Sequence, residues 1–331
     1  MALAAALCAL ALLVEVHLAA RQMILFGQHG SSYFGGTYVG DHTMLCRSAF
    51  LNAAPFYVDS RDIMSGFHVC AQKVWEINTI TLFRKVVAPG DAVIEVGANI
   101  GFFAVVLNRL VGPTGRFHVV EAQPRTFALL RKTMELNFGF EFAMQRVEQF
   151  AAYSADDADL VFSFIPERSA NNAMAMGGGM GTGTTGDGSG SGGGGDHDEP
   201  VARVDSRSVG STMVKGWTLD TKFKDWAKID LIKIDVEGAE DDVWRGMRGL
   251  VRRHPNMRVI MEVNSGRMAD NGKDFMAFYR EMQESYPVLR HMRHRGACVE
   301  EVSVEQLVGA ESADRLLYLS HETHPAARCS W

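Results

Sequence analysis

Short apolar runs and amphipathic segments alternate regularly along the chain from about residue 72 onward. The apolar runs are rich in Val and Ile and predict buried strands at 92–96, 116–121, 229–235 and 257–263. Apolar residues at helical spacing predict helices at 72–87, 101–111, 124–137, 239–254 and 272–285. Strands that alternate with helices build a mostly parallel sheet with helices on both faces, so the pattern predicts an α/β fold.

Other segments add strands to this prediction. A single strand is predicted at 142–150. Two antiparallel pairs are predicted as well, one from 160–165 with 201–204 and the other from 288–302 with 316–320.

The remaining segments divide the chain into further parts. Residues 1–26 form a hydrophobic N-terminal segment, and 27–71 form an irregular lead-in that packs over the main domain at 72–322. Within this domain the Gly-rich insert 176–197 predicts a flexible surface loop, because its composition cannot bury enough apolar surface to offset the entropy of ordering it. A C-terminal tail occupies 323–331.

The N-terminal segment bears on where the protein acts. Residues 1–14 carry no charge and are nearly all apolar, but a bilayer-spanning helix needs roughly twenty such residues. A signal peptide, a marginal membrane anchor, an organellar targeting segment and an ordinary buried helix all fit this run. It therefore predicts a membrane, secretory or organellar location with membrane association through this segment, and a cytoplasmic location is the alternative.

Charge and cysteine content exclude some classes of function. The formal net charge of -6 argues against a nucleic-acid partner held mainly through its phosphates. The five cysteines are odd in number, widely spaced and without a C-x-x-C pair, which fits neither a disulfide framework nor a zinc site. We expect buried free thiols, with one bridge such as Cys46–Cys70 as the alternative if the chain is exported.

The turn after the first predicted strand is a candidate ligand site. Gly97, Asn99 and Gly101 form a tight strand-to-helix bend where absent Cβ atoms let a ligand approach the backbone. Glu121 follows at the end of the next predicted strand, 20 residues beyond Gly101, where its carboxylate can accept both ribose hydroxyls of an adenosine. Strand, turn, helix and acid together predict a site for an adenosine-containing cofactor.

The residues around this turn favour S-adenosylmethionine over a dinucleotide. The dinucleotide fingerprint places its second glycine against the pyrophosphate, and here that position is Asn99. Glu95 precedes the turn, where a carboxylate repels a pyrophosphate but can meet the ammonium of a methionine. Backbone N–H groups at the turn can meet the methionine carboxylate.

A second cluster carries the candidate catalytic groups. The buried strand at 229–235 brings Asp235 and Glu237 to its carboxyl end, the edge at which open α/β sheets bind ligands. Asp235 could orient the acceptor, accept its proton or hold a metal, and Glu237 or Glu262 are the other candidates for the base. Glu237 and Glu240 could instead favour the N-terminal dipole of the next helix.

These two clusters resemble the FkbM-type methyltransferases. The resemblance rests on residues 93–101 (VIEVGANIG) and more specifically on residues 232–240 (IKIDVEGAE), and it extends over roughly 75–263. It implies a Rossmann-like class I methyltransferase fold with a mostly parallel seven-stranded sheet. It also implies S-adenosylmethionine as donor and transfer to a hydroxyl oxygen of a small-molecule, sugar or lipid-linked acceptor. By this resemblance the methionine end would be lined by Glu95, Gly97, Asn99 and Gly101, and the ribose by Glu121.

Other interpretations of the same residues stay open. Asp235, Glu262 and Asn264 are similar to the oxygen ligands with which catechol-type methyltransferases hold magnesium, although an ordinary polar cluster at strand ends explains them as well, and we assign no metal ligand. An NAD(P)-dependent oxidoreductase would share the fold, but the sequence lacks the glycine pattern and a recognisable catalytic set. The third alternative is an inactive interaction module that keeps the fold.

Overall fold

The computed structural model describes residues 36–72, 76–164, 173–175, 210–293, 298–308 and 315–321. Outside these ranges lie the N-terminal segment 1–26, the Gly-rich insert 176–197, the predicted strand 201–204 and the tail 323–331. In the part of the chain that is described, no helix is both long and apolar enough to cross a membrane.

An eight-stranded sheet forms the centre of the fold, with the order β14-β13-β15-β12-β11-β4-β5-β6. Its strands are β4 (Ala92–Val96), β5 (Arg116–Glu121), β6 (Val147–Gln149), β11 (Leu231–Ile234), β12 (Arg258–Val263), β13 (Leu289–Arg293), β14 (Cys298–Glu301) and β15 (Arg315–Leu319). From β12 to β6 all neighbours are parallel, whereas β15 and β14 run antiparallel to theirs. The mostly parallel sheet is confirmed, but the single strand predicted at 288–302 is divided into β13 and β14, so the sheet has eight strands instead of seven.

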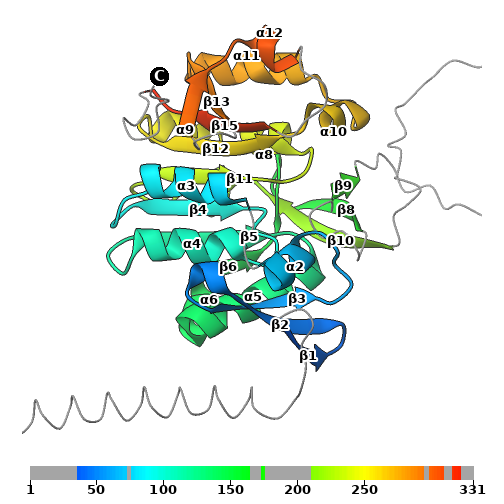
Figure 1. Ribbon diagram of the computed structural model, residues 1–331. Coiled ribbons are helices and arrows are strands. Elements are labelled where there is room, and N and C mark those ends of the chain that lie inside the picture. Colours follow the sequence, from blue (N-terminus) through cyan, green and yellow to red (C-terminus); the bar gives the residue numbers. More distant parts are fainter. Residues whose placement is uncertain are drawn as a thin grey trace, which may run out of the picture.

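Helices cover both faces of this sheet (Figure 1). One face carries α3 (Ile77–Val86), α4 (Phe102–Val111) and α5 (Pro124–Phe138), and the other carries α8 (Glu240–Arg245), α9 (Arg248–Arg253) and α11 (Phe275–Ser285). Since successive strand residues point to opposite faces, Leu231 joins the core with α3 and α4, and Ile232 joins the core with α8 and α9. Glu95 and Lys233 are paired with each other and lie two residues beyond Val93 and Leu231 on the same strands, so their side chains point to the same α3–α4 face.

The shorter elements complete the fold. They are α6 (Phe140–Arg146), α7 (Leu219–Lys222), α10 (Ser265–Asp270) and α12 (Val304–Val308), and a small sheet of β7 (Ala151–Ala152), β8 (Ala158–Phe164), β9 (Ala173–Ala175) and β10 (Gly210–Trp217). The strand predicted at 142–150 is wrong over most of its length, because residues 140–146 are helical. Gly139 ends α5 and α6 begins after it, with the Phe142 ring packed on the Phe138 ring at a centroid distance of 5.3 Å.

The segment before the main domain is more ordered than its composition predicts. Instead of an irregular lead-in, residues 36–59 form an antiparallel sheet of β1 (Gly36–Gly40), β2 (Thr43–Ser48) and β3 (Ala54–Asp59), followed by α2 (Ser65–Phe67) and η2 (His68–Gln72). This sheet packs on α5, where the Tyr57 N–H donates to Thr133 Oγ1 at 3.0 Å. Alternating residues of β2 and β3 are buried, a pattern concealed by the short lengths of the strands.

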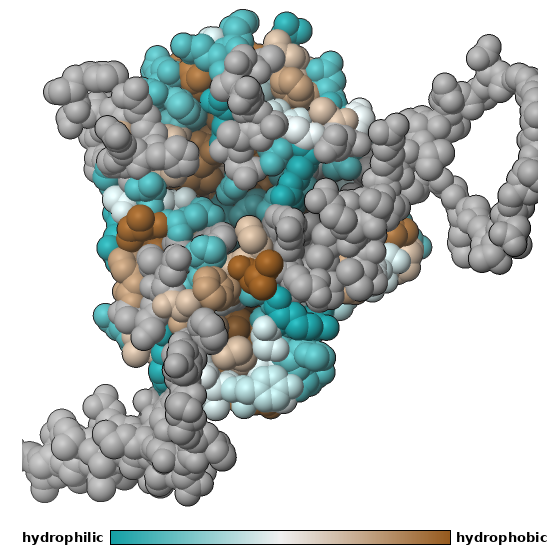
Figure 2. Space-filling view, turned by 45° about the vertical axis from the view of Figure 1, so that its right-hand side comes forward, coloured by the Kyte–Doolittle hydropathy of each residue, from teal (hydrophilic) through white to brown (hydrophobic). Residues whose placement is uncertain are grey.

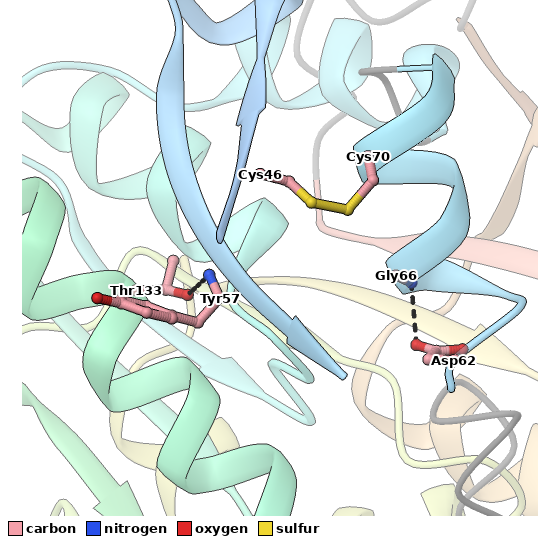
Figure 3. The surroundings of a disulfide bond; sticks show 6 residues. All are labelled: Cys46, Tyr57, Asp62, Gly66, Cys70 and Thr133. Atoms are coloured by element: carbon pink, nitrogen blue, oxygen red, sulfur yellow. Dashed lines mark hydrogen bonds between the residues drawn. A yellow bond between two sulfur atoms is a disulfide. The ribbon is translucent and has the colours of Figure 1, made fainter. Parts of the chain in front are cut away.

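A disulfide ties this sheet to the helical turn that follows it. Cys46 on β2 and Cys70 on η2 are both buried, with Cα atoms 5.2 Å apart, and their sulfur atoms are bonded (Figure 3). The Asp62 carboxylate fixes the start of α2, since it accepts hydrogen bonds from the Gly66 N–H at 2.9 Å and the Ser65 hydroxyl at 2.8 Å. Our expectation of free thiols is therefore wrong for Cys46 and Cys70.

Removing this bridge tests its role in stability. We expect the double variant Cys46→Ala/Cys70→Ala to lose about 3 kcal/mol in free energy of unfolding, because the bridge closes a loop of about 25 residues and so restricts the unfolded chain. Urea denaturation under non-reducing conditions measures this loss. The single variant Cys46→Ala serves as the control for cavity formation and should lose at least as much. Equal denaturation midpoints for the wild type and the double variant would contradict the prediction.

Candidate functional site

A cavity of about 260 Å³ opens at the carboxyl ends of β4, β5 and β11. It is bounded by the turn after β4, by residues 235–239 after β11, and by the N-terminal residues Met64, Ser65 and Val69. In Figure 2, hydrophilic residues gather in a recess at the middle of this side of the molecule. The location is the one expected for ligands of an open α/β sheet.

The predicted glycine turn forms one wall of the cavity. Gly97, Asn99 and Gly101 all have positive φ angles, of 76°, 51° and 91°. Two backbone N–H groups, those of Gly97 and Ala98, donate to the Val120 carbonyl and hold the turn on β5. A Cβ atom at Gly97 would lie 1.7 Å from the Asp235 carbonyl oxygen, so only glycine lets the ends of β4 and β11 come this close.

Glu121 reaches the cavity from the end of β5. Its carboxylate accepts the Asn99 N–H at Oε2 (2.8 Å) and the Gln123 N–H at Oε1 (2.9 Å). Each oxygen keeps a further lone pair for a ligand hydroxyl. Burial raises the pKa of Glu121, and the two backbone hydrogen bonds oppose this shift. The structure thus brings Glu121 together with the turn, as predicted from the sequence.

Asp235, Lys233 and Glu95 form a buried charged group beside the turn. Lys233 is 2% exposed, and its Nζ lies 3.1 Å from Asp235 Oδ2 and 3.6 Å from Glu95 Oε1. Burial alone would lower the pKa of Lys233, but Asp235 and Glu95 outweigh it and raise that pKa. Lys233 therefore stays protonated at neutral pH.

Glu95 lies behind the cavity wall and does not line the cavity. It is fully buried, and neither carboxylate oxygen has a hydrogen-bond partner among the described residues. Burial raises the pKa of Glu95 to about 7, and the charge of Lys233 limits this shift. The direct contact with a methionine ammonium that we predicted is not available in this arrangement, because Lys233 lies between Glu95 and the cavity.

The two other candidate bases have different surroundings. Glu237 has a φ angle of 59° and forms an ion pair with Arg267, so its carboxylate is already engaged. Burial, together with the charges of Asp235 and Glu76, raises the pKa of Glu262 to about 10, and Glu262 is thus protonated at neutral pH. Both line the cavity with Asp235.

The geometry gives no support to the magnesium hypothesis. Asn264 Oδ1 accepts the Arg267 N–H at 2.8 Å and caps α10, so this oxygen is used within the protein. Among the described residues, no group of three or more His, Cys, Asp or Glu side chains is arranged to hold a metal ion.

Sequence reasoning missed several residues of the cavity. Lys233 could have been noticed, since it is a charged residue inside an otherwise apolar strand. No comparable sequence signal marked Glu76 or Ser65 as cavity residues. Glu76 lies at the start of α3, and the Ser65 hydroxyl accepts a hydrogen bond from Asn99 Nδ2 at 3.3 Å. They come from segments remote in sequence that only the folded chain brings to the turn.

The opposite part of the cavity is mostly apolar. It is lined by Ala122, Phe150, Ala151, Ala152 and Phe162, which belong to the ends of β5 and β6 and to the small sheet. Such a surface suits a flat aromatic ring rather than a charged group. The cavity therefore has a charged end at Asp235 and Lys233 and an apolar end, with Glu121 between them.

The sheet order and the cavity are those of a Rossmann-like methyltransferase fold. The sequence profile described as "Methyltransferase FkbM domain" matches residues 95–293, more than half of the chain. The chain belongs to the FkbM methyltransferase family, as the motifs of the sequence predicted.

Other known proteins are similar to parts of the chain. "Methyltransferase 1" of Beauveria bassiana (strain ARSEF 2860) is 25% identical over 162 residues, which are 48% of this chain and 59% of the relative. The chain thus spans less than two thirds of the length of this curated relative.

Solved structures show weaker similarity. Precorrin-6y C5,15-methyltransferase from Geobacter metallireducens GS-15 has a TM-score of 0.36 at 9% identity, over 75% of this chain and 88% of that one. The O-methyltransferase TomG from Streptomyces achromogenes in complex with SAM has a TM-score of 0.35 at 11% identity, over 74% of this chain and 78% of that one.

The protonated state of Glu262 has a measurable consequence. The folded protein keeps this proton up to about pH 10, whereas an ordinary glutamate releases it near 4.5. Between these values the folded state binds more protons than the unfolded state, so the free energy of unfolding falls as pH rises. We expect Glu262→Gln to become more stable relative to the wild type from pH 5 to pH 9, by up to about 1.4 kcal/mol per pH unit.

Urea denaturation at pH 5, 7 and 9 measures this difference. Glu284→Gln is the control, because Glu284 is exposed and its replacement should leave the pH dependence of the wild type unchanged. Parallel stability curves for the wild type and Glu262→Gln would show that Glu262 is ionised in the folded protein.

Proposed function

We propose that this protein transfers a methyl group from S-adenosylmethionine to a hydroxyl oxygen of a small-molecule, sugar or lipid-linked acceptor. Membership of the FkbM family supports this proposal. The observation that carries it is the position of Glu121, whose carboxylate lies at the cavity between the apolar end and the charged end.

The residues of the cavity fit such a donor. The apolar group at Ala122, Phe150 and Phe162 would take the adenine ring, and Glu121 would accept the ribose hydroxyls. The open backbone at Gly97 and Gly101 would let the methionine end approach the turn. The Asp235 carboxylate lies at this end of the cavity and can interact with a sulfonium cation.

When bound, the donor supplies an electrophilic methyl group on a sulfonium. The protein must hold the acceptor oxygen in line with that group, exclude water and accept the hydroxyl proton. The N-terminal residues Met64, Ser65 and Val69 cover one side of the cavity and so reduce the access of water to it. Asp235, 22% exposed, would accept the proton.

The surroundings of the three acids place Asp235 first among the candidate bases. Glu262 already carries a proton at neutral pH and can donate a hydrogen bond but cannot take up the acceptor's proton. Glu237 is held by Arg267. Asp235 keeps one oxygen, Oδ1, without a hydrogen bond to any described residue, and this atom is available to an acceptor.

We infer that the protein acts in an oxidising compartment. A buried disulfide joins Cys46 to Cys70, and Cys298 is also disulfide-bonded. Such bonds are rare in proteins of reducing compartments. The apolar segment 1–26 supports delivery to the secretory pathway or attachment to its membrane. Peptide mapping of the protein alkylated in intact cells tests this, and free thiols at Cys46 and Cys70 would contradict it.

Ligand titration tests the proposed donor. We expect calorimetry to show binding of S-adenosylhomocysteine and no binding of NAD, because the second glycine of the dinucleotide turn is replaced by Asn99. Glu121→Ala should weaken S-adenosylhomocysteine about tenfold or more through loss of the hydroxyl acceptor, whereas Glu284→Ala, which changes an exposed residue, should leave it unchanged. Binding of NAD alone would favour an oxidoreductase, and binding of neither ligand an inactive module.

The assignment of the base is tested separately. We expect Asp235→Asn to lower turnover by about 10²-fold or more, since the amide cannot take up the proton, while S-adenosylhomocysteine affinity changes by less than about threefold. Incorporation of labelled methyl groups into a metabolite extract measures turnover. If neither turnover nor affinity changes, Asp235 is not the base.

A further inference from the structure

Lys233 is a charge in a position normally occupied by an apolar residue. It lies in β11 between Ile232 and Ile234, two fully buried side chains, and is itself 2% exposed. Placing an ammonium there is unfavourable unless it is compensated by opposite charge. Its side chain nevertheless lines the cavity, at the face on which the sheet meets α3 and α4.

Several acids surround Lys233, although its partner on β12 is Ile260. Glu95 lies on β4, Asp235 follows β11, Glu262 lies on β12, and Glu76 precedes α3. The Phe103 ring of α4 also contacts Lys233, with its centroid 5.1 Å from Nζ. On β5, Glu121 is the next acid along the sheet. Arg267, the other cation at the cavity, is paired with Glu237. Lys233 is therefore the cation among the described residues that compensates this group of acids.

Its contact with Asp235 is directional. Nζ binds Oδ2 at 3.1 Å, which leaves Oδ1 without a hydrogen bond to a described residue. A buried ion pair adds little to stability compared with well-packed apolar side chains. The rest of β11 is apolar, so packing alone gives no reason for a lysine here. The pair lies instead where it controls the orientation of the candidate base.

We propose that Lys233 is a positioning residue, which fixes the Asp235 carboxylate through Oδ2 so that Oδ1 meets the acceptor hydroxyl. This inference rests on the proposed function. In the step it serves, the hydroxyl proton passes to Oδ1, the oxygen lone pair forms the new C–O bond, and the electron pair of the broken C–S bond remains on sulfur. Lys233 stays charged throughout and exchanges no proton.

Three variants test this role. Lys233→Met removes the charge at similar length, and Lys233→Met/Glu95→Gln removes the charge together with its buried counterion. Lys228→Met is the matched control, because Lys228 forms an exposed ion pair with Asp230 at 3.0 Å just before the same strand. Unfolding free energy, S-adenosylhomocysteine affinity and the pH profile of kcat/KM for labelled methyl transfer are measured for each.

We expect the double variant to regain the stability lost in Lys233→Met but not the activity. Turnover should stay about 10²-fold below the wild type in both, a loss typical of a misplaced base. The acidic limb of the pH profile should move up by about one unit or more, because an adjacent cation favours the ionised carboxylate. Lys228→Met should match the wild type in both measurements.

Two results would overturn the inference. If the double variant regains activity along with stability, Lys233 only balances the charge of Glu95. If the variants bind S-adenosylhomocysteine normally and their pH profiles superimpose on that of the wild type, Lys233 does not position the base. Failure of the wild type itself to bind S-adenosylhomocysteine would overturn the proposed function, and this inference with it.

Discussion

The ends of β4 and β11 meet at the α-carbon of Gly97 and the carbonyl of Asp235, where a Cβ atom would lie 1.7 Å from the oxygen. This approach joins the turn that would hold a donor to the strand end that carries the candidate base. The Asp235 N–H also donates to the Val96 carbonyl at 3.1 Å, which continues the sheet to its edge. Distances within the cavity are therefore set by the backbone of the sheet.

Much of the central sheet could be predicted from the sequence, because its strands are continuous apolar runs separated by helices. The turn at Gly97, the acid at Glu121 and the strand end at Asp235 could be predicted for the same reason, since strand order brings carboxyl ends to one edge. The one strand predicted at 288–302 is divided into β13 and β14, which pair antiparallel with each other, and this pairing is a tertiary contact that the pattern did not show.

Other features depend on tertiary contacts that no local pattern reveals. Glu95 and Lys233 are paired in the sheet, and both side chains point to the face covered by α3 and α4. The sequence does not show which face of the sheet these helices cover, so the burial of Glu95 behind Lys233 could not be predicted. The helix at 140–146 replaces a predicted strand because Phe142 packs on Phe138, the last residue of the preceding helix α5. The Cys46–Cys70 bond depends on the sheet β1–β3, whose short strands gave no clear period.

Residues that precede the family match form one wall of the cavity, so the matched region alone does not contain the whole binding site. The family match begins at residue 95, whereas Met64, Ser65 and Val69 belong to the segment held by the disulfide. A fragment cut at the start of the match would keep Gly97, Glu121 and Asp235 and lack one side of its binding site. In a lineage that exchanged domains, residues 36–72 would have to be inherited together with the sheet they cover.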